Sequence, residues 1–199
     1  MTGRNKSTDR RGQILRTAAA LFIKNGYSDT HVRDIASLCG INISTLYHYI
    51  GSKHNILEMF LVYSYDILEK FINQHRESLY NSDPVETLRK SLERYISIVD
   101  ENQDLVVFWY QEAKDLTPLQ FQKQIRLEEH IVQFYEELIS WGNKNGSFSV
   151  KDVKLVANNI IVTCDMWAFR RWMIRKHFTL KDFNKRQIET IMTQVMSNS

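Results

Sequence analysis

The stretch CGINISTLYHYIGSKHNIL, residues 39–57, places three ring side chains in a row between two glycines. A helix that begins after Asn42, a favourable N-cap, directs Leu46 and Ile50 inward, because residues three or four apart share a helix face. Ile43 has the same spacing and is predicted to face inward with them. The remaining side chains share the flank and the open face: Ser44, Thr45, Tyr47, His48 and Tyr49. The stretch therefore predicts a short helix, apolar on one side and rich in hydrogen-bonding groups on the other.

Two helices are predicted ahead of this one. Over residues 9–25 apolar side chains recur at steps of three and four, which is typical of an amphipathic helix. Gly26 then ends the helix in the left-handed conformation, with Tyr27 folded back onto the last turn. Asp29 or Thr30 is expected to cap a second, short helix with an apolar inner face. Two short helices joined by a tight turn that contains glycine form a helix-turn-helix.

Further helix starts follow along the chain. Ser52 is expected to cap a long helix that runs to about Leu79, and a break near residues 101–103 separates two later helices. The other starts are marked by Asp83-Pro84, Thr117-Pro118, Ser149 and Thr179. A capping side chain, a proline at N1 and an acid at N3 are the usual signs of a helix N-terminus. The sequence therefore predicts an all-α chain of about nine helices and no sheet.

The composition of the 199-residue chain agrees with this prediction. Two prolines and seven glycines leave few places to break a helix, and 43% hydrophobic residues suffice for a sizeable core. No apolar run approaches membrane-spanning length, the first residues lack the apolar core of a signal peptide, and the two cysteines lack metal-site spacing. We find no nucleophile–base set and no phosphate-binding glycine loop. We therefore expect a cytoplasmic protein without membrane contact, catalytic residues, metal or cofactor.

Positive charge is concentrated near the start of the chain. Residues 1–53 hold eight Lys or Arg and three Asp, a net charge of +5, whereas the whole chain carries +3 and the rest therefore −2. A basic module on a neutral to acidic body is typical of a nucleic-acid reader, and residues 4–11 are interpreted as a disordered basic arm. We accordingly predict a DNA-binding domain over residues 1–52, with its motif at about 30–50, and a separate helical domain over 53–199.

A helix that enters the major groove needs short residues near its start, donors on its outer face and apolar residues behind them. In the helix after Asn42, His48 offers a donor or acceptor to a base edge, and the Tyr47 hydroxyl can reach a phosphate. Lys53 lies at the start of the next helix, where its ammonium and the helix N-terminus both favour a phosphate. The residues predicted to contact DNA are Thr30, Arg33, Asn42, Ser44, Thr45, Tyr47, His48, Tyr49 and Lys53. The alternatives are that the tyrosines pack in a three-helix core and that Thr30 acts first as a helix cap.

The segment THVRDIASLCGINISTLYHYIGSKHNIL, residues 30–57, resembles the DNA-binding signature of the TetR family of bacterial repressors. The residues that carry the resemblance are Thr30, Ile35-Ala36, Gly40, Leu46-Tyr47-His48-Tyr49 and Lys53. The similarity covers about residues 9–60. Ile50 stands where Phe is usual, and Ile43-Ser44 replace a frequent Lys-Gly pair, which removes a common phosphate contact. The resemblance implies a homodimer on a palindromic double-stranded DNA operator, controlled by a small-molecule inducer or corepressor.

The dimer surface is expected from the last two long helices, which in the TetR family build a four-helix bundle across the twofold axis. The segment VKLVANNIIVTCDMWAFRRWMIRK, residues 153–176, is too apolar for a monomer surface. A second apolar stripe is formed by Ile188, Ile191, Met192 and Val195. The alternative is burial of both segments within one subunit.

Aromatic residues between the motif and these last helices suggest a cavity for an elongated apolar or aromatic compound. The predicted ligand contacts are Trp109, Tyr110, Glu112, Arg126, His130, Phe134, Trp167 and Arg170. Over residues 167–176 cations lie among tryptophans and would clamp an anionic headgroup, such as the phosphates of a coenzyme A thioester. Regulators that this chain resembles include acyl-CoA sensors. Alternatively, these cations rim the dimer interface.

The sequence thus predicts a homodimeric transcriptional repressor that a small molecule releases from its operator. The alternative is a ligand carrier or enzyme-like helical protein with a vestigial DNA-binding module. Binding to DNA that weakens steeply with salt would favour the repressor, because each neutralised phosphate releases counterions.

Overall fold

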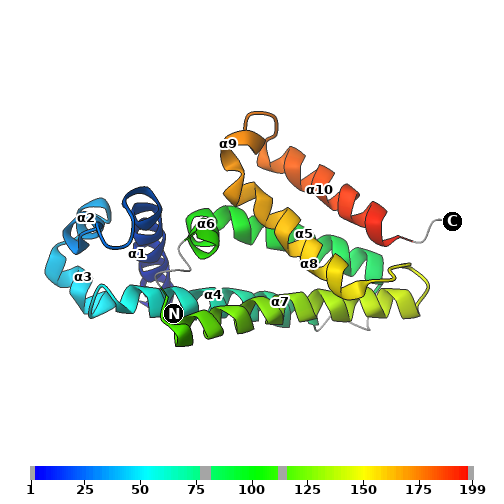
Figure 1. Cartoon of the computed structure of the whole chain (residues 1–199), viewed down its shortest axis with the longest axis horizontal. Coiled ribbons are helices and arrows are strands. Elements are labelled where there is room, and N and C mark those ends of the chain that lie inside the picture. The colour runs from blue at the N-terminus through cyan, green and yellow to red at the C-terminus, as the bar shows by residue number, and fades with distance from the viewer. Residues whose placement is uncertain (1–2, 77–81, 112–115, 197–199) are drawn as a thin grey trace. The chain divides into compact units, whose positions relative to one another are not determined.

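The computed structural model describes residues 3–76, 82–111 and 116–196 of the chain, and helices dominate all three ranges (Figure 1). The helices are α1 (Gly3–Asn25), α2 (Val32–Leu38), α3 (Ile43–Ile50), α4 (Asn55–Arg76), α5 (Pro84–Glu101), α6 (Gln103–Gln111), α7 (Pro118–Lys144), α8 (Val153–Phe169), α9 (Arg171–Ile174) and α10 (Leu180–Val195). In these ranges the one strand-like pairing is an isolated bridge between Phe148 and Met196. The all-α prediction is therefore confirmed. No helix in the ranges described is both long and apolar enough to cross a membrane.

The described ranges hold ten helices where about nine were expected, because the segment that follows Asp152 is broken. α8 ends at Phe169, and α9 follows Arg170 as a separate helix of four residues. α8 also begins later than predicted. The Asp152 side chain accepts a hydrogen bond from the backbone N–H of Leu155 at 3.0 Å, so Asp152 and not Ser149 is the N-cap. The prediction placed the cap one turn too early.

The other helix boundaries after residue 82 follow the sequence signals closely. The Asp83 side chain accepts from the backbone N–H of Val85 at 2.8 Å and caps α5. Thr179 caps α10 in the same way, since its hydroxyl accepts from the backbone N–H of Asp182 at 3.2 Å. The expected break between α5 and α6 falls at Asn102. These predicted starts and the break are confirmed.

The chain forms two compact units. Unit 1 comprises Met1–Tyr65 and Asp104–Gln124, and unit 2 comprises Asp66–Gln103 and Ile125–Ser199. The divisions fall inside α4, α6 and α7, so each of these helices contributes residues to both units. The functional domains predicted from the sequence, 1–52 and 53–199, are a different division and stay a prediction.

Unit 1 has an apolar core to which α6 contributes as well as the first four helices. The Phe22 ring of α1 meets the rings of Phe60 and Phe108 at centroid distances of 6.0 and 6.1 Å, and the last two rings lie 4.9 Å apart. All three side chains are fully buried. Burial of such a side chain stabilises the fold by about 1.5–3 kcal/mol. Phe108 thus completes the core beneath the helix-turn-helix from a distant part of the chain.

The turn after α1 is built as the sequence predicts. Gly26 has a φ of 85°, a conformation that glycine adopts without steric cost, and its N–H donates to the carbonyl of Phe22 at 2.7 Å. Tyr27 folds back so that its ring lies edge-on to Phe22, 5.0 Å between centroids. The end of α1 is therefore fixed in direction, which sets the path of the chain into α2.

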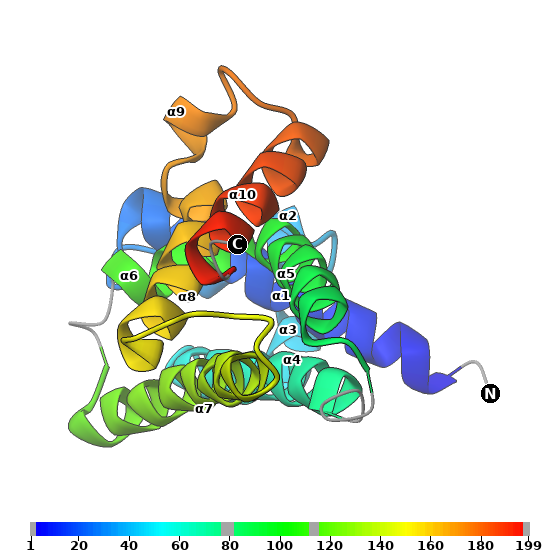
Figure 2. The same ribbon diagram turned by 90° about the vertical axis from the view of Figure 1, so that its right-hand side faces the viewer.

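Within unit 2, α5, α8 and α10 pack against one another (Figure 2). Arg89 of α5 donates to Glu189 of α10 at 2.7 Å across this packing. Ile191, Met192 and Val195 are at most 2% exposed. Three residues of the apolar stripe of α10 are therefore covered inside a single chain, and the fourth, Ile188, is half-buried, so the stripe is not the open surface that the sequence suggested.

Candidate nucleic-acid interface

α3 is fixed at its start and along one side. The Asn42 side chain accepts a hydrogen bond from the backbone N–H of Thr45 at 2.7 Å, which confirms Asn42 as the N-cap. Leu46 is fully buried and Ile50 is 2% exposed, so both anchor α3 in the core of unit 1 as predicted. Gly51, with a φ of 68°, ends the helix. α3 is therefore held at both ends and from behind.

The opposite side of α3 is open to solvent. Tyr47 and Tyr49 are 44% and 37% exposed, and the Tyr49 ring lies against that of His48 with 6.2 Å between centroids. Ser44 is also exposed, whereas Thr45 is half-buried. The alternative that the tyrosines are enclosed in a three-helix core is not what the structure shows. The face carries hydroxyl, imidazole and phenol groups, which can donate and accept hydrogen bonds.

Ile43 does not face inward. It is the first residue of α3 and its side chain is 46% exposed, although it has the same spacing from Leu46 as the buried positions. The inward prediction is wrong: Ile43 stands in the first turn of α3 and, among the described residues, is not one of the side chains that form or cover the core of unit 1. An apolar side chain therefore lies beside the polar ones on the open face.

Arg33 is a cation on α2, the helix that precedes α3 in the sequence. Its side chain is 74% exposed, and its Nε lies 3.9 Å from the Asp34 carboxylate. An ion pair this exposed contributes little, so the guanidinium can exchange it for another anion.

Thr30 is placed differently from the other predicted contacts. It is fully buried, and its hydroxyl donates to the carbonyl of Gly26 at 2.9 Å and lies 3.2 Å from that of Leu21. The N-cap of α2 is His31, whose side chain makes no capping hydrogen bond. The expectation that Asp29 or Thr30 caps α2 is therefore wrong. Thr30 instead closes the end of α1, and its predicted contact with DNA stays untested.

Lys53 has a structural contact that the sequence did not reveal. Its ammonium donates to the carbonyl of Ser28 at 3.0 Å and lies 4.5 Å from the centroid of the Tyr27 ring. The residue thus ties the turn after α3 to the loop after α1, while an ammonium has two further donors. Next to it, the Ser52 hydroxyl accepts from the backbone N–H of Asn55 at 3.2 Å and caps α4, as predicted.

Arg10 is a second cation with a role that sequence reasoning missed. It lies in α1, which already begins at Gly3, so the expected disordered arm is helical from that residue. Its guanidinium donates to the carbonyl of Cys39 at 3.0 Å and to the Gln13 side chain at 2.6 Å. Arg10 thereby fastens α1 to the turn between α2 and α3. The periodic apolar pattern that starts only at Ile14 gave no sign of this extension.

The predicted ligand contacts on α6 belong to unit 1. The Trp109 indole donates to the Ser64 hydroxyl at 3.2 Å and lies against Phe108, 5.2 Å between centroids. Tyr110 is 52% exposed. Glu112 lies outside the described residues.

The predicted ligand contacts in unit 2 have separate surroundings. Phe134 is fully buried and packs against Phe71 at 5.5 Å between centroids, and His130 Nδ1 lies 3.0 Å from the Glu69 carboxylate. Arg126 and Arg170 are exposed. The contacts described for these side chains do not join them in one common site, so their role in ligand binding stays a prediction.

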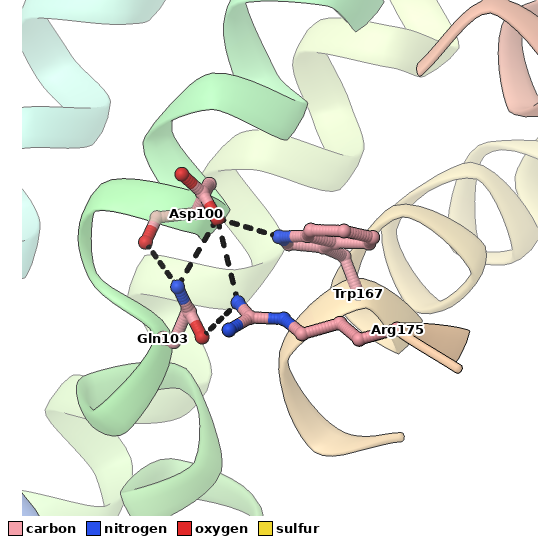
Figure 3. A network of polar contacts seen from close by, with 4 residues as sticks. All are labelled: Asp100, Gln103, Trp167 and Arg175. Carbon is pink, nitrogen blue, oxygen red and sulfur yellow. Dashed lines mark hydrogen bonds and ion pairs between the residues drawn. The ribbon is translucent and has the colours of Figure 1, made fainter. Parts of the chain in front are cut away.

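Trp167 belongs to a network of polar contacts with Asp100, Gln103 and Arg175 (Figure 3). The Trp167 indole donates to the Asp100 carboxylate at 2.7 Å, and the Arg175 guanidinium lies 4.9 Å from the Trp167 ring. Arg175 also lies 3.5 Å from the same carboxylate and donates to the Gln103 side chain. The network joins the end of α8 and the residue after α9 to the break between α5 and α6. Two members of the cluster at 167–176 are therefore used inside the chain.

A buried polar cluster in unit 2 was not predicted. The Tyr95 hydroxyl donates to the Asp165 carboxylate at 3.1 Å. Tyr135 is fully buried, and its hydroxyl interacts with the Ser91 side chain, although this contact lacks the geometry of a full hydrogen bond. Burial, and secondarily Cys164, raises the pKa of Tyr135 well above 10.0, and burial likewise raises the pKa of the Cys164 thiol well above 9.0. Both groups are therefore neutral near pH 7.

A short capped helix with an apolar back and an open polar face, placed after a second helix and a tight turn, defines a helix-turn-helix DNA-binding protein. Comparison with known families agrees with this assignment. Residues 14–59 match the family described as bacterial regulatory proteins, tetR family, and residues 81–172 match the tetracyclin repressor-like C-terminal domain. The chain belongs to the TetR family and is a DNA-binding transcriptional regulator.

Several characterised proteins resemble the chain over most of its length. It is 26% identical to the transcriptional regulator HbdR of Aromatoleum sp. strain CIB, over 88% of this chain and 76% of HbdR. It is 29% identical to the repressor KstR2 of Mycolicibacterium smegmatis, over 84% of this chain and 81% of KstR2. The structure of the ketosteroid regulator KstR2 of Mycobacterium tuberculosis superimposes with a TM-score of 0.77 at 25% identity, and covers 95% of this chain and 96% of KstR2.

Proposed function

We propose that the protein is a cytoplasmic homodimeric repressor that binds a palindromic operator and leaves it when a small molecule binds the helical domain. The open face of α3 carries this proposal. Its hydroxyl and imidazole groups stand on a helix that Leu46 and Ile50 hold rigidly from behind. A reading helix needs this combination, because base contacts are directional and tolerate little movement.

The contacts with DNA divide into two kinds. We assign His48 and Ser44, which are exposed on α3, to base edges in the major groove. We assign Tyr47 and Tyr49, on its two flanks, to phosphate oxygens, together with the cations of Arg33 and Lys53. Thr30 is left out of this interface, because its hydroxyl already bonds the end of α1.

Dimerisation follows from the short reach of one reading helix. A single helix-turn-helix contacts few base pairs, so two copies related by a twofold axis are needed for useful specificity. We assign the interface to α8 and α10. On α8, Leu155 and Val162 are 56% and 47% exposed, and their spacing of seven residues places them on one face of the helix. The α10 contribution is mainly polar, since three residues of its apolar stripe are covered within the chain and Ile188 is half-buried.

We assign the ligand to the class of elongated, mainly apolar compounds. Unit 2 buries aromatic side chains around Phe134, and the buried Tyr135 hydroxyl, whose contact with Ser91 falls short of a full hydrogen bond, can anchor a carbonyl or hydroxyl group. The structure of the relative KstR2 is described as that of a ketosteroid regulator, and a ketosteroid has this chemistry. An acyl-CoA is the second member of the class, because the exposed Arg170 and Lys176 can meet phosphates.

Binding to DNA over a range of salt concentrations tests the proposed function. DNA ligands are first selected from a random duplex library with the purified protein, and the dissociation constant is then measured at several salt concentrations. A repressor selects a palindrome, and its affinity falls linearly with salt on a double-logarithmic plot. A carrier with a vestigial module selects no sequence. Recovery of random sequence after repeated rounds would refute the proposal.

A further inference from the structure

We propose that Ile43 reads a thymine in each half of the operator by packing against its C5 methyl group. The inference rests on the proposed function and adds one base-specific contact to it. It starts from the exposure of Ile43, the first residue of the reading helix, which is 46% exposed instead of buried.

The position of Ile43 suits a base contact. The N-terminal residues of a reading helix are those that meet base edges in this class of protein. Tyr47 lies one turn further along the same flank and is also exposed, so Ile43 and Tyr47 form a continuous surface on that side of α3. The cap bond from Asn42 fixes the first turn, and hence the place of Ile43.

The chemistry of Ile43 selects its partner. An aliphatic side chain forms no hydrogen bonds, so it cannot bind a phosphate favourably. Packed against a polar base edge, it would leave the donors and acceptors of the base without hydrogen-bond partners. The C5 methyl of thymine is the apolar group that the major groove presents. In a helix the β-branched isoleucine has one strongly preferred rotamer, so little side-chain freedom is lost when the contact forms.

Leu38 is the other exposed aliphatic side chain of the motif, at 65% exposure, but it occupies a different place. It is the last residue of α2, and the first helix of a helix-turn-helix crosses the DNA backbone while the second enters the groove. The contact with the base is therefore assigned to Ile43.

Replacement of thymine by deoxyuridine removes the methyl and nothing else. Each thymine of the selected operator is replaced in turn, symmetrically in both half-sites, and the affinity is measured with the wild type and with Ile43→Ala. We expect one position at which deoxyuridine weakens wild-type binding by about fourfold per half-site, the equivalent of one buried methyl group. At that position Ile43→Ala should bind both duplexes equally.

Two controls separate this contact from a general effect. Val62→Ala removes a similarly exposed aliphatic group on α4 and should keep the full sensitivity to deoxyuridine. The slope of affinity against salt should be the same for Ile43→Ala and the wild type, because no phosphate contact is lost. Ile43→Ala should also melt at the wild-type temperature, since the side chain is not in the core.

The outcomes are distinct. If every deoxyuridine position affects wild type and Ile43→Ala equally, the proposed thymine contact is refuted while DNA binding stands. If the wild type selects no operator at all, the proposed function and the thymine contact both fall.

Discussion

Replacement of Arg175 by alanine probes the network that joins α8 and α9 to the break between α5 and α6. Arg175 lies over the Trp167 ring and contacts the side chains of Asp100 and Gln103. An exposed cation–π contact stabilises by about 0.5–1 kcal/mol, and a partly exposed ion pair adds about 0–1 kcal/mol. Since the Arg175 side chain is 42% exposed, we expect a loss of no more than the sum of these terms, about 0.5–2 kcal/mol in the free energy of unfolding.

Thermal unfolding followed by far-ultraviolet circular dichroism measures this loss. For a protein of this size, about 1 kcal/mol corresponds to a shift of about 2–4 °C in Tm, so Tm should fall by about 1–8 °C. Arg170→Ala is the matched control, because Arg170 is also exposed and lies on the same connection. Its effect should stay within about 0.5 kcal/mol.

A double-mutant cycle with Asp100→Asn locates the source of the effect. If Arg175 and Asp100 act together, their two losses should fall short of additivity by about 0.5 kcal/mol or more. The reasoning fails if Arg175→Ala and Arg170→Ala unfold with the same midpoint.

Three further results are expected. Tyr47→Ala combined with Lys53→Ala should abolish operator binding in a gel-shift assay while dimerisation persists; retarded DNA at wild-type protein concentrations would contradict the assigned face. Glu189→Gln should flatten the decline of Tm at acid pH, because Arg89 lowers the pKa of Glu189 below 4.5. The stability that the Arg89–Glu189 pair contributes is fully present above pH 4.5 and is lost as the pH falls through the lowered pKa of Glu189. Parallel curves of Tm against pH for the variant and the wild type would therefore contradict this contribution. Cys164 should resist a thiol reagent at pH 8 until the protein unfolds, because the thiol is buried and its pKa is raised; rapid labelling of the folded protein would show that the site opens.

The sequence predicted the fold well where local chemistry decides the structure. The end of α1 at Gly26, the cap at Asn42 and the breaks in the second half of the chain depend on residues close together in the sequence. The inward and outward sides of α3 also follow, because Leu46 and Ile50 are the only strongly apolar pair at helical spacing beyond its first turn.

The errors arise where contacts outside a residue's own predicted helix decide its position. Ile43 has the correct spacing for burial, yet nothing in its own segment tells whether another helix reaches the first turn. The sequence position of Thr30 suggests an N-cap of α2, but its hydroxyl donates a hydrogen bond to the Gly26 carbonyl after the end of α1. Likewise, the stripe of α10 is apolar for packing within one chain, and periodicity does not distinguish this from a subunit interface.

The position of Phe108 has a practical consequence for protein engineering. Chimaeric regulators are built by grafting the reading head of one protein onto the sensor of another. A graft cut after the first 52 residues here would discard Phe60 as well as Phe108 and leave the Phe22 ring facing water. A transplantable head must therefore carry two separate pieces of the gene, residues 1–65 and 104–124.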